Sequence, residues 1–188
     1  PSRVFGGQVI GQALIAALRT IEGRPCHSLH GYFLRPGDPS IPIIYEVDRI
    51  RDGKSFTTRR VIAIQKGEAI FNMSASFQVF EDGLSHQIEM PDVPRPDDLP
   101  TEEEMFEKRK KNMTPEMITM MTRDRPVEMK RVEDIDYLNP VKSDPVQHIW
   151  FKSKKKLGDD PAQHQCLLAY SSDMGLLSTA QQVALKNV

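Results

Sequence analysis

The sequence predicts an α+β protein, in which one long helix precedes a run of sequentially paired antiparallel strands. Residues 5–21 carry a helical stripe of apolar side chains, and apolar residues recur with a period of two between residues 27 and 80. No alternation of strands with helices follows, as a parallel sheet would require. We expect the helix to lie across the concave face of the sheet.

The helix expected over residues 5–21 has its apolar residues on one side, because they recur at spacings of four. They are Val9, Ile10, Ala13, Leu14, Ala17, Leu18 and Ile21. Gly6 and Gly7 stand at the helix entry, where the backbone turns or another segment approaches closely. This helix is therefore expected to be largely buried.

The strands are expected over residues 27–35, 43–50, 56–65 and 69–80. Two short turns that contain Gly53 and Gly67 separate the last three strands, which is typical of hairpins. These three strands should therefore form an antiparallel meander.

The chain is expected to divide into an N-terminal module over residues 1–82, a linker over 83–125 and a C-terminal module over 126–188. The linker is rich in proline and aspartate, and Thr101 with Glu104 predicts a capping box that opens a connector helix. The C-terminal module shows two strand-like stretches, 127–132 and 146–154, and a helical run over 163–180. Since an independent sheet needs about three strands, this module is expected to be incomplete.

Composition excludes several classes of protein. The 188 residues contain 25 Lys and Arg against 26 Asp and Glu, and this formal net charge of -1 argues against binding to nucleic acid. Cys26 and Cys166 predict neither a zinc site nor a disulfide framework. No apolar run reaches the roughly 18 residues of a membrane span. We therefore expect a soluble, intracellular protein. The phosphate-binding, dinucleotide-binding and nucleophile-elbow motifs do not occur, so hydride transfer and nucleotide hydrolysis are not expected.

The helix entry Gly6, Gly7 and Gln8 is the first candidate site. Its backbone N–H groups and the positive end of the helix dipole would suit a polarised carbonyl oxygen, as in a thioester. The competing interpretation, close helix–strand packing at glycine, is favoured from the residues alone.

His27 and His30 are the second candidates, since histidine can act as a general base near neutral pH. At this spacing on a strand their side chains point to opposite faces, so a shared metal is not expected. A satisfied strand histidine is the commoner outcome.

Asp173 is the most informative residue, because it lies between Leu167-Leu168 and Leu176-Leu177. Burial of a carboxylate in an apolar segment is costly unless the group is paired, hydrogen-bonded or catalytic. The alternative is an N-cap at which a new helix starts, and the residues alone leave the two interpretations even.

Eight segments match a known family pattern: Arg3–Val9, His27–His30, Arg35–Asp38, Arg51–Gly53 and Ala75–Gln78 in the first half, and Asp124–Pro126, His164-Gln165 and Ala169–Asp173 in the second. In these segments the chain resembles the acyl-CoA thioesterase II, or TesB-like, family. The resemblance implies a double hotdog, with two modules that each wrap an antiparallel sheet around a long helix. It also implies hydrolysis of medium- to long-chain fatty acyl-CoA to a free acid and coenzyme A, without a metal or redox cofactor.

The resemblance further implies that Asp173 acts on the reacting water together with a serine or threonine and a glutamine. Those two partners are expected beyond the end of this sequence, so the 188 residues alone should hydrolyse little substrate. The family pattern stops after Thr179-Ala180, and both ends are expected to be cut. We expect a homo-oligomer, cytoplasmic in a bacterium or peroxisomal in a eukaryote.

Two other functions stay open. One is an acyl-thioester dehydratase on the same fold, with His27 as the base. The other is a non-catalytic acyl-CoA-binding protein.

Overall fold

The structure, a computed structural model, describes residues 3–136 and 142–184. Contacts divide the chain into two compact units. Unit 1 consists of Pro1–Ser85 and Leu157–Asp173, and unit 2 of His86–Lys156 and Met174–Val188. Each unit is described by itself below.

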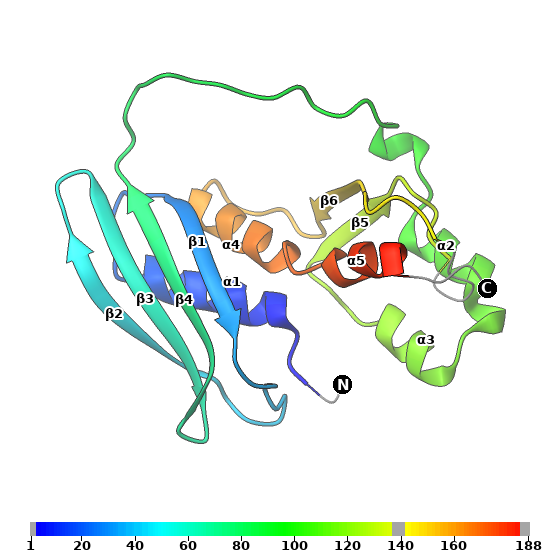
Figure 1. The fold of residues 1–188 in the computed structure, drawn as a ribbon, viewed down its shortest axis with the longest axis horizontal. Coiled ribbons are helices and arrows are strands. Elements are labelled where there is room, and N and C mark those ends of the chain that lie inside the picture. The colour runs from blue at the N-terminus through cyan, green and yellow to red at the C-terminus, as the bar shows by residue number, and fades with distance from the viewer. Residues whose placement is uncertain (1–2, 137–141, 185–188) are drawn as a thin grey trace. The chain divides into compact units, whose positions relative to one another are not determined.

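Unit 1 contains a four-stranded antiparallel sheet (Figure 1). Its strands are β1 (Cys26–Phe33), β2 (Ile44–Asp52), β3 (Phe56–Gln65) and β4 (Glu68–Gln78), in the order β1-β4-β3-β2. The expected meander of β2, β3 and β4 is confirmed, and β1 pairs with β4 at the other edge. The β3–β4 turn needs left-handed backbone at Lys66 and Gly67, with φ values of 52° and 77°.

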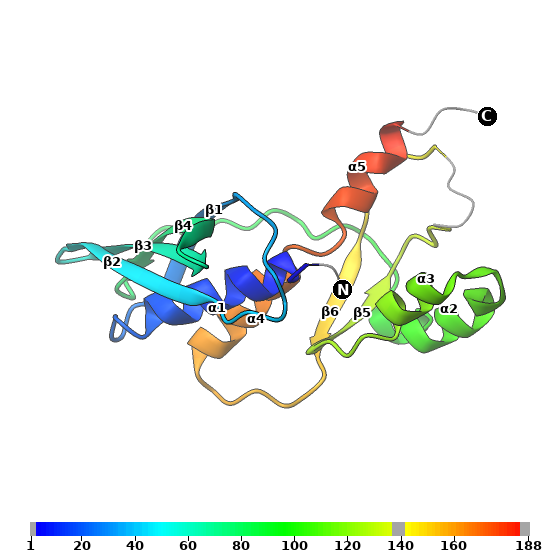
Figure 2. The ribbon, with the colours of Figure 1, turned by 90° about the horizontal axis from the view of Figure 1, so that it is seen from below.

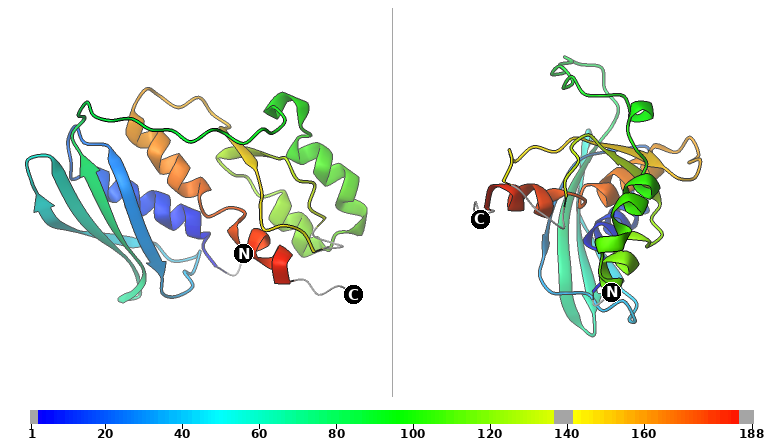
Figure 3. Two further views of the ribbon diagram at one scale, coloured as in Figure 1. Left: turned by 45° about the horizontal axis from the view of Figure 1, so that its top comes forward. Right: turned by 90° about the vertical axis from the view of Figure 1, so that its right-hand side faces the viewer.

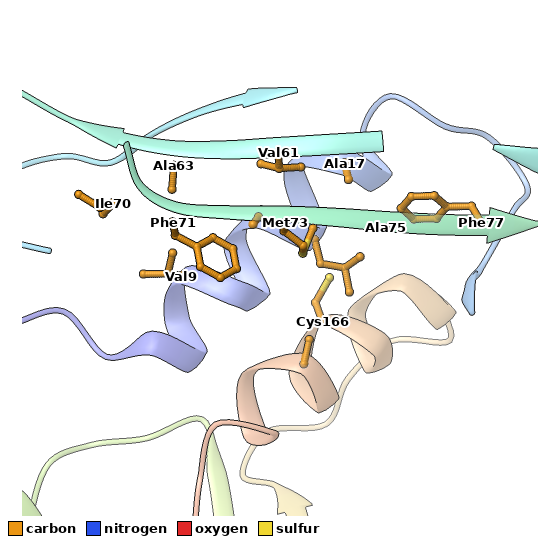
Figure 4. Close-up of a cluster of buried hydrophobic side chains, with 13 residues drawn as sticks. Val9, Ala17, Val61, Ala63, Ile70, Phe71, Met73, Ala75, Phe77 and Cys166 are labelled. Atoms are coloured by element: carbon orange, nitrogen blue, oxygen red, sulfur yellow. The ribbon is translucent and has the colours of Figure 1, made fainter. Parts of the chain in front are cut away.

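Helix α1 (Gly6–Leu18) lies along one face of this sheet and shares a core with it (Figure 4). The strands alternate as expected: Phe71, Met73, Ala75 and Phe77 of β4 are buried against the helix side. Val9, Ala13, Leu14 and Ala17 supply the helix half of the core, which confirms the apolar stripe.

A buried arginine ties the end of α1 to the sheet. Arg59 on β3 is only 2% exposed, and its guanidinium donates to the Thr20 hydroxyl and the Thr20 carbonyl just beyond α1. It also donates to the Arg51 and Thr58 carbonyls and to Asp52 Oδ1 at 2.6 Å. Because the charge is paired and hydrogen-bonded throughout, the core tolerates it.

A second helix, α4 (Pro161–Ser171), packs antiparallel on α1 within unit 1 (Figure 1). Tyr170 lies against Gly7, whereas Cys166, one turn earlier in α4, lies against Gly11, one turn later in α1. The single helical run expected over residues 163–180 is therefore wrong in one respect. The run breaks at residues 172–175, where Gly175 has a φ of 88°, and a new helix, α5 (Leu176–Ala184), follows.

Unit 2 contains a two-stranded antiparallel sheet of β5 (Val127–Arg131) and β6 (Ile149–Ser153) with short helices near it (Figure 2). Besides α5, the helices of this unit are α2 (Glu102–Arg109) and α3 (Pro115–Met121), and two 3₁₀ turns span Pro96–Asp98 and Lys110–Asn112. Thr101 and Glu104 form the capping box that the sequence predicts. Both strands predicted in this half are confirmed.

The segment that follows β4 is extended (Figure 3). It carries the exposed apolar side chains Phe80, Leu84 and Ile88. The expected module boundaries, 1–82, 83–125 and 126–188, stay a prediction, because compact units defined by contacts need not coincide with hotdog modules. Residues 185–188, the end of the expected C-terminal module, lie outside the described residues.

Candidate active site

The structure brings two of the predicted site segments together. Asp173, in the turn after α4, accepts a hydrogen bond at Oδ2 from the backbone N–H of Gly7, the second residue of α1, at 2.9 Å. A helix N-terminus leaves its first N–H groups without intrahelical partners and carries a partial positive charge. The carboxylate therefore occupies a position at which a negative charge is stabilised.

The two glycines of the helix entry are required by close approach. A Cβ atom on Gly7 would stand 2.1 Å from the Tyr170 carbonyl oxygen, so the backbone of α4 needs glycine here. A Cβ on Gly6 would stand 2.6 Å from both Asp173 Oδ2 and Phe33 Cζ. Close packing at glycine is thus present, but at Gly7 the neighbour is a helix rather than a strand.

The Phe33 ring also lies near the Asp173 carboxylate. It lies at the end of β1 on the same face as Gly31, whose Cα is packed against the Phe71 ring on the α1 side of the sheet. The Phe33 ring is 52% exposed and stacks at a tilt on Phe71, with 4.9 Å between ring centroids. An accessible apolar surface therefore lies beside Asp173.

The pKa of the Asp173 carboxyl is raised above its ordinary value. Desolvation by burial is the main cause, while the Gly7 N–H and the positive charge of Arg3 act in the opposite direction. A carboxylate with a raised pKa and one fixed hydrogen-bond donor is a suitable group to orient or deprotonate a water molecule.

His27 lies away from this pair of groups. Its Nε2 is 2.8 Å from the Ser76 hydroxyl, and Ser76 alternates with the buried Ala75 and Phe77, so the imidazole is on the face opposite α1. His30 lies in an edge-to-face contact with Tyr32. Neither histidine is brought to Asp173 within unit 1.

Sequence reasoning missed the position of Phe33 beside Asp173 and the contact that joins the middle of α4 to β1. Gln165 pairs with the backbone of Cys26 through both atoms of its amide, at 3.0 and 2.7 Å. The hydrophobic periodicity of the sequence could not predict the role of Phe33 or of Gln165, because their contacts join residues far apart in the chain.

Among residues 3–136 and 142–184 no group of three or more His, Cys, Asp or Glu side chains is arranged to hold a metal ion. Over the same residues no helix is long and apolar enough to cross a bilayer.

A helix laid on an antiparallel sheet, with a carboxylate at the helix entry, defines a protein of the hotdog class. A protein from Alicyclobacillus acidocaldarius whose structure is described as a hot dog fold shares this fold at a TM-score of 0.66. It is 21% identical, and the alignment covers 93% of this chain and 62% of that one.

Comparison with protein-family models places the chain in a particular family within the hotdog class. The profile of the acyl-CoA thioesterase N-terminal domain matches residues 1–78, and that of acyl-CoA thioesterase matches residues 120–186. Together these two models cover most of the chain, which belongs to the acyl-CoA thioesterase family. The resemblance found in the sequence is thereby confirmed.

Three relatives show the extent of the similarity. The chain is 40% identical to acyl-coenzyme A thioesterase 8 of Mus musculus over 187 residues, or 95% of this chain and 58% of that protein. It is 40% identical to acyl-CoA thioesterase 2 of Haemophilus influenzae over 179 residues, or 95% and 63%. The crystal structure of acyl-CoA thioesterase II TesB2 from Mycobacterium marinum matches with a TM-score of 0.73 at 44% identity, covering 96% and 63%. This chain thus spans about three fifths of the length of these relatives.

Proposed function

We propose that this protein hydrolyses medium- to long-chain fatty acyl-CoA thioesters to a free fatty acid and coenzyme A. The observation that carries the proposal is the hydrogen bond between Asp173 Oδ2 and the Gly7 N–H at the entry of α1. It places a half-desolvated carboxylate beside the exposed Phe33 ring, where water and an apolar acyl group can meet.

In the proposed reaction Asp173 orients a water molecule and accepts its proton as the oxygen attacks the thioester carbonyl carbon. The C–S bond then breaks, the thiolate of coenzyme A leaves and takes up a proton, and the acyl group departs as the carboxylic acid. Neither a metal nor a redox cofactor takes part in this sequence of steps. Gly6, Gly7 and Gln8 are proposed to border the thioester.

The serine or threonine and the glutamine that the family resemblance implies are not assigned to any residue of this sequence. We therefore propose that this chain alone hydrolyses little substrate and that the active protein includes them. We also propose a homo-oligomer, in the cytoplasm of a bacterium or the peroxisome of a eukaryote. A relative of Saccharomyces cerevisiae, 38% identical over 79 residues, is named a peroxisomal acyl-coenzyme A thioester hydrolase.

The test is product analysis with the full natural chain on palmitoyl-CoA and on a 3-hydroxyacyl-CoA. Free thiol and fatty acid in equal amounts support the proposal. An enoyl product without thiol would identify a dehydratase, and saturable binding without turnover would identify an acyl-CoA-binding protein. A dehydratase is the less favoured outcome, because His27 lies on the face of the sheet opposite α1.

A further inference from the structure

Glycine packing alone does not fix how far α4 is displaced along α1. Gly7 and Gly11 present a smooth backbone surface to the Tyr170 and Cys166 carbonyls. This glycine contact sets the separation of the two helices, but glycine has no side chain that could interlock with α4. Across it, the Phe5 and Tyr170 rings meet edge to face at 5.1 Å, and Cys166 packs in the core that α1 shares with the sheet. None of these apolar contacts is directional, so they resist sliding less than a pair of hydrogen bonds does. One residue of sliding corresponds to about 1.5 Å of rise, which would break a hydrogen bond at the end of the helix.

Gln165 ties α4 to the first residue of β1, close to the glycine contact between α1 and α4. Its Oε1 accepts from the Cys26 N–H at 3.0 Å, and its Nε2 donates to the Cys26 carbonyl at 2.7 Å. The amide thus takes both hydrogen-bonding groups of the first residue of β1, as a neighbouring strand would. A pair of hydrogen bonds to one rigid backbone unit restrains translation and rotation together.

We propose that Gln165 is a positioning residue, which sets the axial position of α4 on α1 so that the Asp173 carboxylate reaches the Gly7 N–H. Asp173 follows Gln165 by eight residues, so the middle of α4 and the turn after its end are held at separate points, Cys26 and Gly7. This inference rests on the proposed function of Asp173 for its catalytic consequence, but not for its structural content.

The test reads the position of Asp173 directly, in the full chain labelled with ¹⁵N-glycine. The Gly7 amide resonance should shift as the Asp173 carboxyl titrates, and Asp173→Asn should abolish that shift and so assign it. Gln165→Met keeps the length and packing of the side chain but removes both hydrogen bonds. We expect it to reduce the titration shift at Gly7 and to raise amide exchange there by about tenfold, while Gly11 keeps its protection.

Gln163→Ala is the matched control, since Gln163 is an exposed glutamine on the same helix. A second variant, Gln165→Glu, retains the acceptor for the Cys26 N–H but places a carboxylate oxygen at the Cys26 carbonyl. It should also displace Asp173 and should lower kcat with little change in KM. If the Gly7 amide titrates and exchanges as in the wild type in either folded variant, the inference is wrong. Wild-type activity in Asp173→Asn would instead overturn the proposed function and leave the positioning result intact.

Discussion

At the residue scale, the candidate site depends on a carboxylate whose ionised form the fold stabilises poorly. Asp173 is half-buried and has one backbone donor, Gly7, with desolvation as the larger effect on its pKa. The sequence predicted an unusual carboxylate from its apolar neighbours, but it left an N-cap equally open. The choice between them required knowing that α1, more than 160 positions away, begins beside this side chain.

The raised pKa of Asp173 predicts how the stability of the fold depends on pH. Since the folded state binds the Asp173 proton more tightly than the unfolded state, stability should fall as pH rises through the ordinary value of 3.8 and the higher folded value. Asp173→Asn has no charge to desolvate and should unfold at a higher temperature than the wild type at pH 7. The gain should shrink towards pH 4. Asp159→Asn, at an exposed carboxylate, serves as the control, and a variant less stable than the wild type at pH 7 would show that the carboxylate stabilises the fold.

Arg59 permits a comparison within one ion pair. Arg59→Met leaves the Thr20, Arg51 and Thr58 carbonyls without their donor and should cost about 2 kcal/mol in the free energy of unfolding. Asp52→Asn should cost less, because the introduced amide oxygen can still accept from the Arg59 guanidinium and lies where the Asp52 side chain is 60% exposed to water. Urea unfolding of both variants decides the matter, and equal losses would mean that the ion pair dominates.

At the element scale, local patterns predicted most helices and strands. Alternation located β3 and β4, the apolar stripe located α1, and the capping box located α2. The break between α4 and α5 was missed as a boundary, although Asp173 had raised the possibility of a new helix. The pairing of α4 with α1 could not be predicted, since it depends on tertiary contacts at Gly7 and Gly11 rather than on local periodicity.

The glycine contact between α1 and α4 can be tested by adding a methyl group at each glycine. Gly7→Ala should cost about 3 kcal/mol, because its Cβ would meet backbone atoms of α4 that cannot rotate away. Gly11→Ala should stay within about 1 kcal/mol of the wild type, since the gain in helix propensity offsets a contact of 3.2 Å with the Cys166 carbonyl. Gly83→Ala meets no atom within 4 Å and is the control in thermal unfolding. Equal effects at Gly7 and Gly11 would contradict the packing described.

At the scale of the whole molecule, the chain crosses between its two units more than once. Residues 86–156 belong to unit 2, and the chain then re-enters unit 1 at Leu157–Asp173. The candidate site is therefore assembled from segments near both ends of the sequence. A reading along the chain predicted consecutive modules and could not foresee this return. The expected oligomer and the module boundaries stay predictions.

Limited proteolysis should cut first in the extended segment after β4. Phe80 and Leu84 have exposed fractions of 88% and 108%, and both are substrates for chymotrypsin. We expect one early cleavage there, with the fragments staying together under native conditions because Leu157–Asp173 packs in unit 1. Mass spectrometry of the fragments checks this. Resistance of the segment would show that it is covered in the assembled protein.

The most direct test of the central claim is thiol release from palmitoyl-CoA by the full chain, with its intact mass verified, for the wild type, Asp173→Asn and the control Asp159→Asn. If the carboxylate at the entry of α1 activates water, Asp173→Asn should lower kcat by about 10²–10⁴-fold while Asp159→Asn matches the wild type. Undiminished thiol release by a correctly folded Asp173→Asn protein would contradict the account.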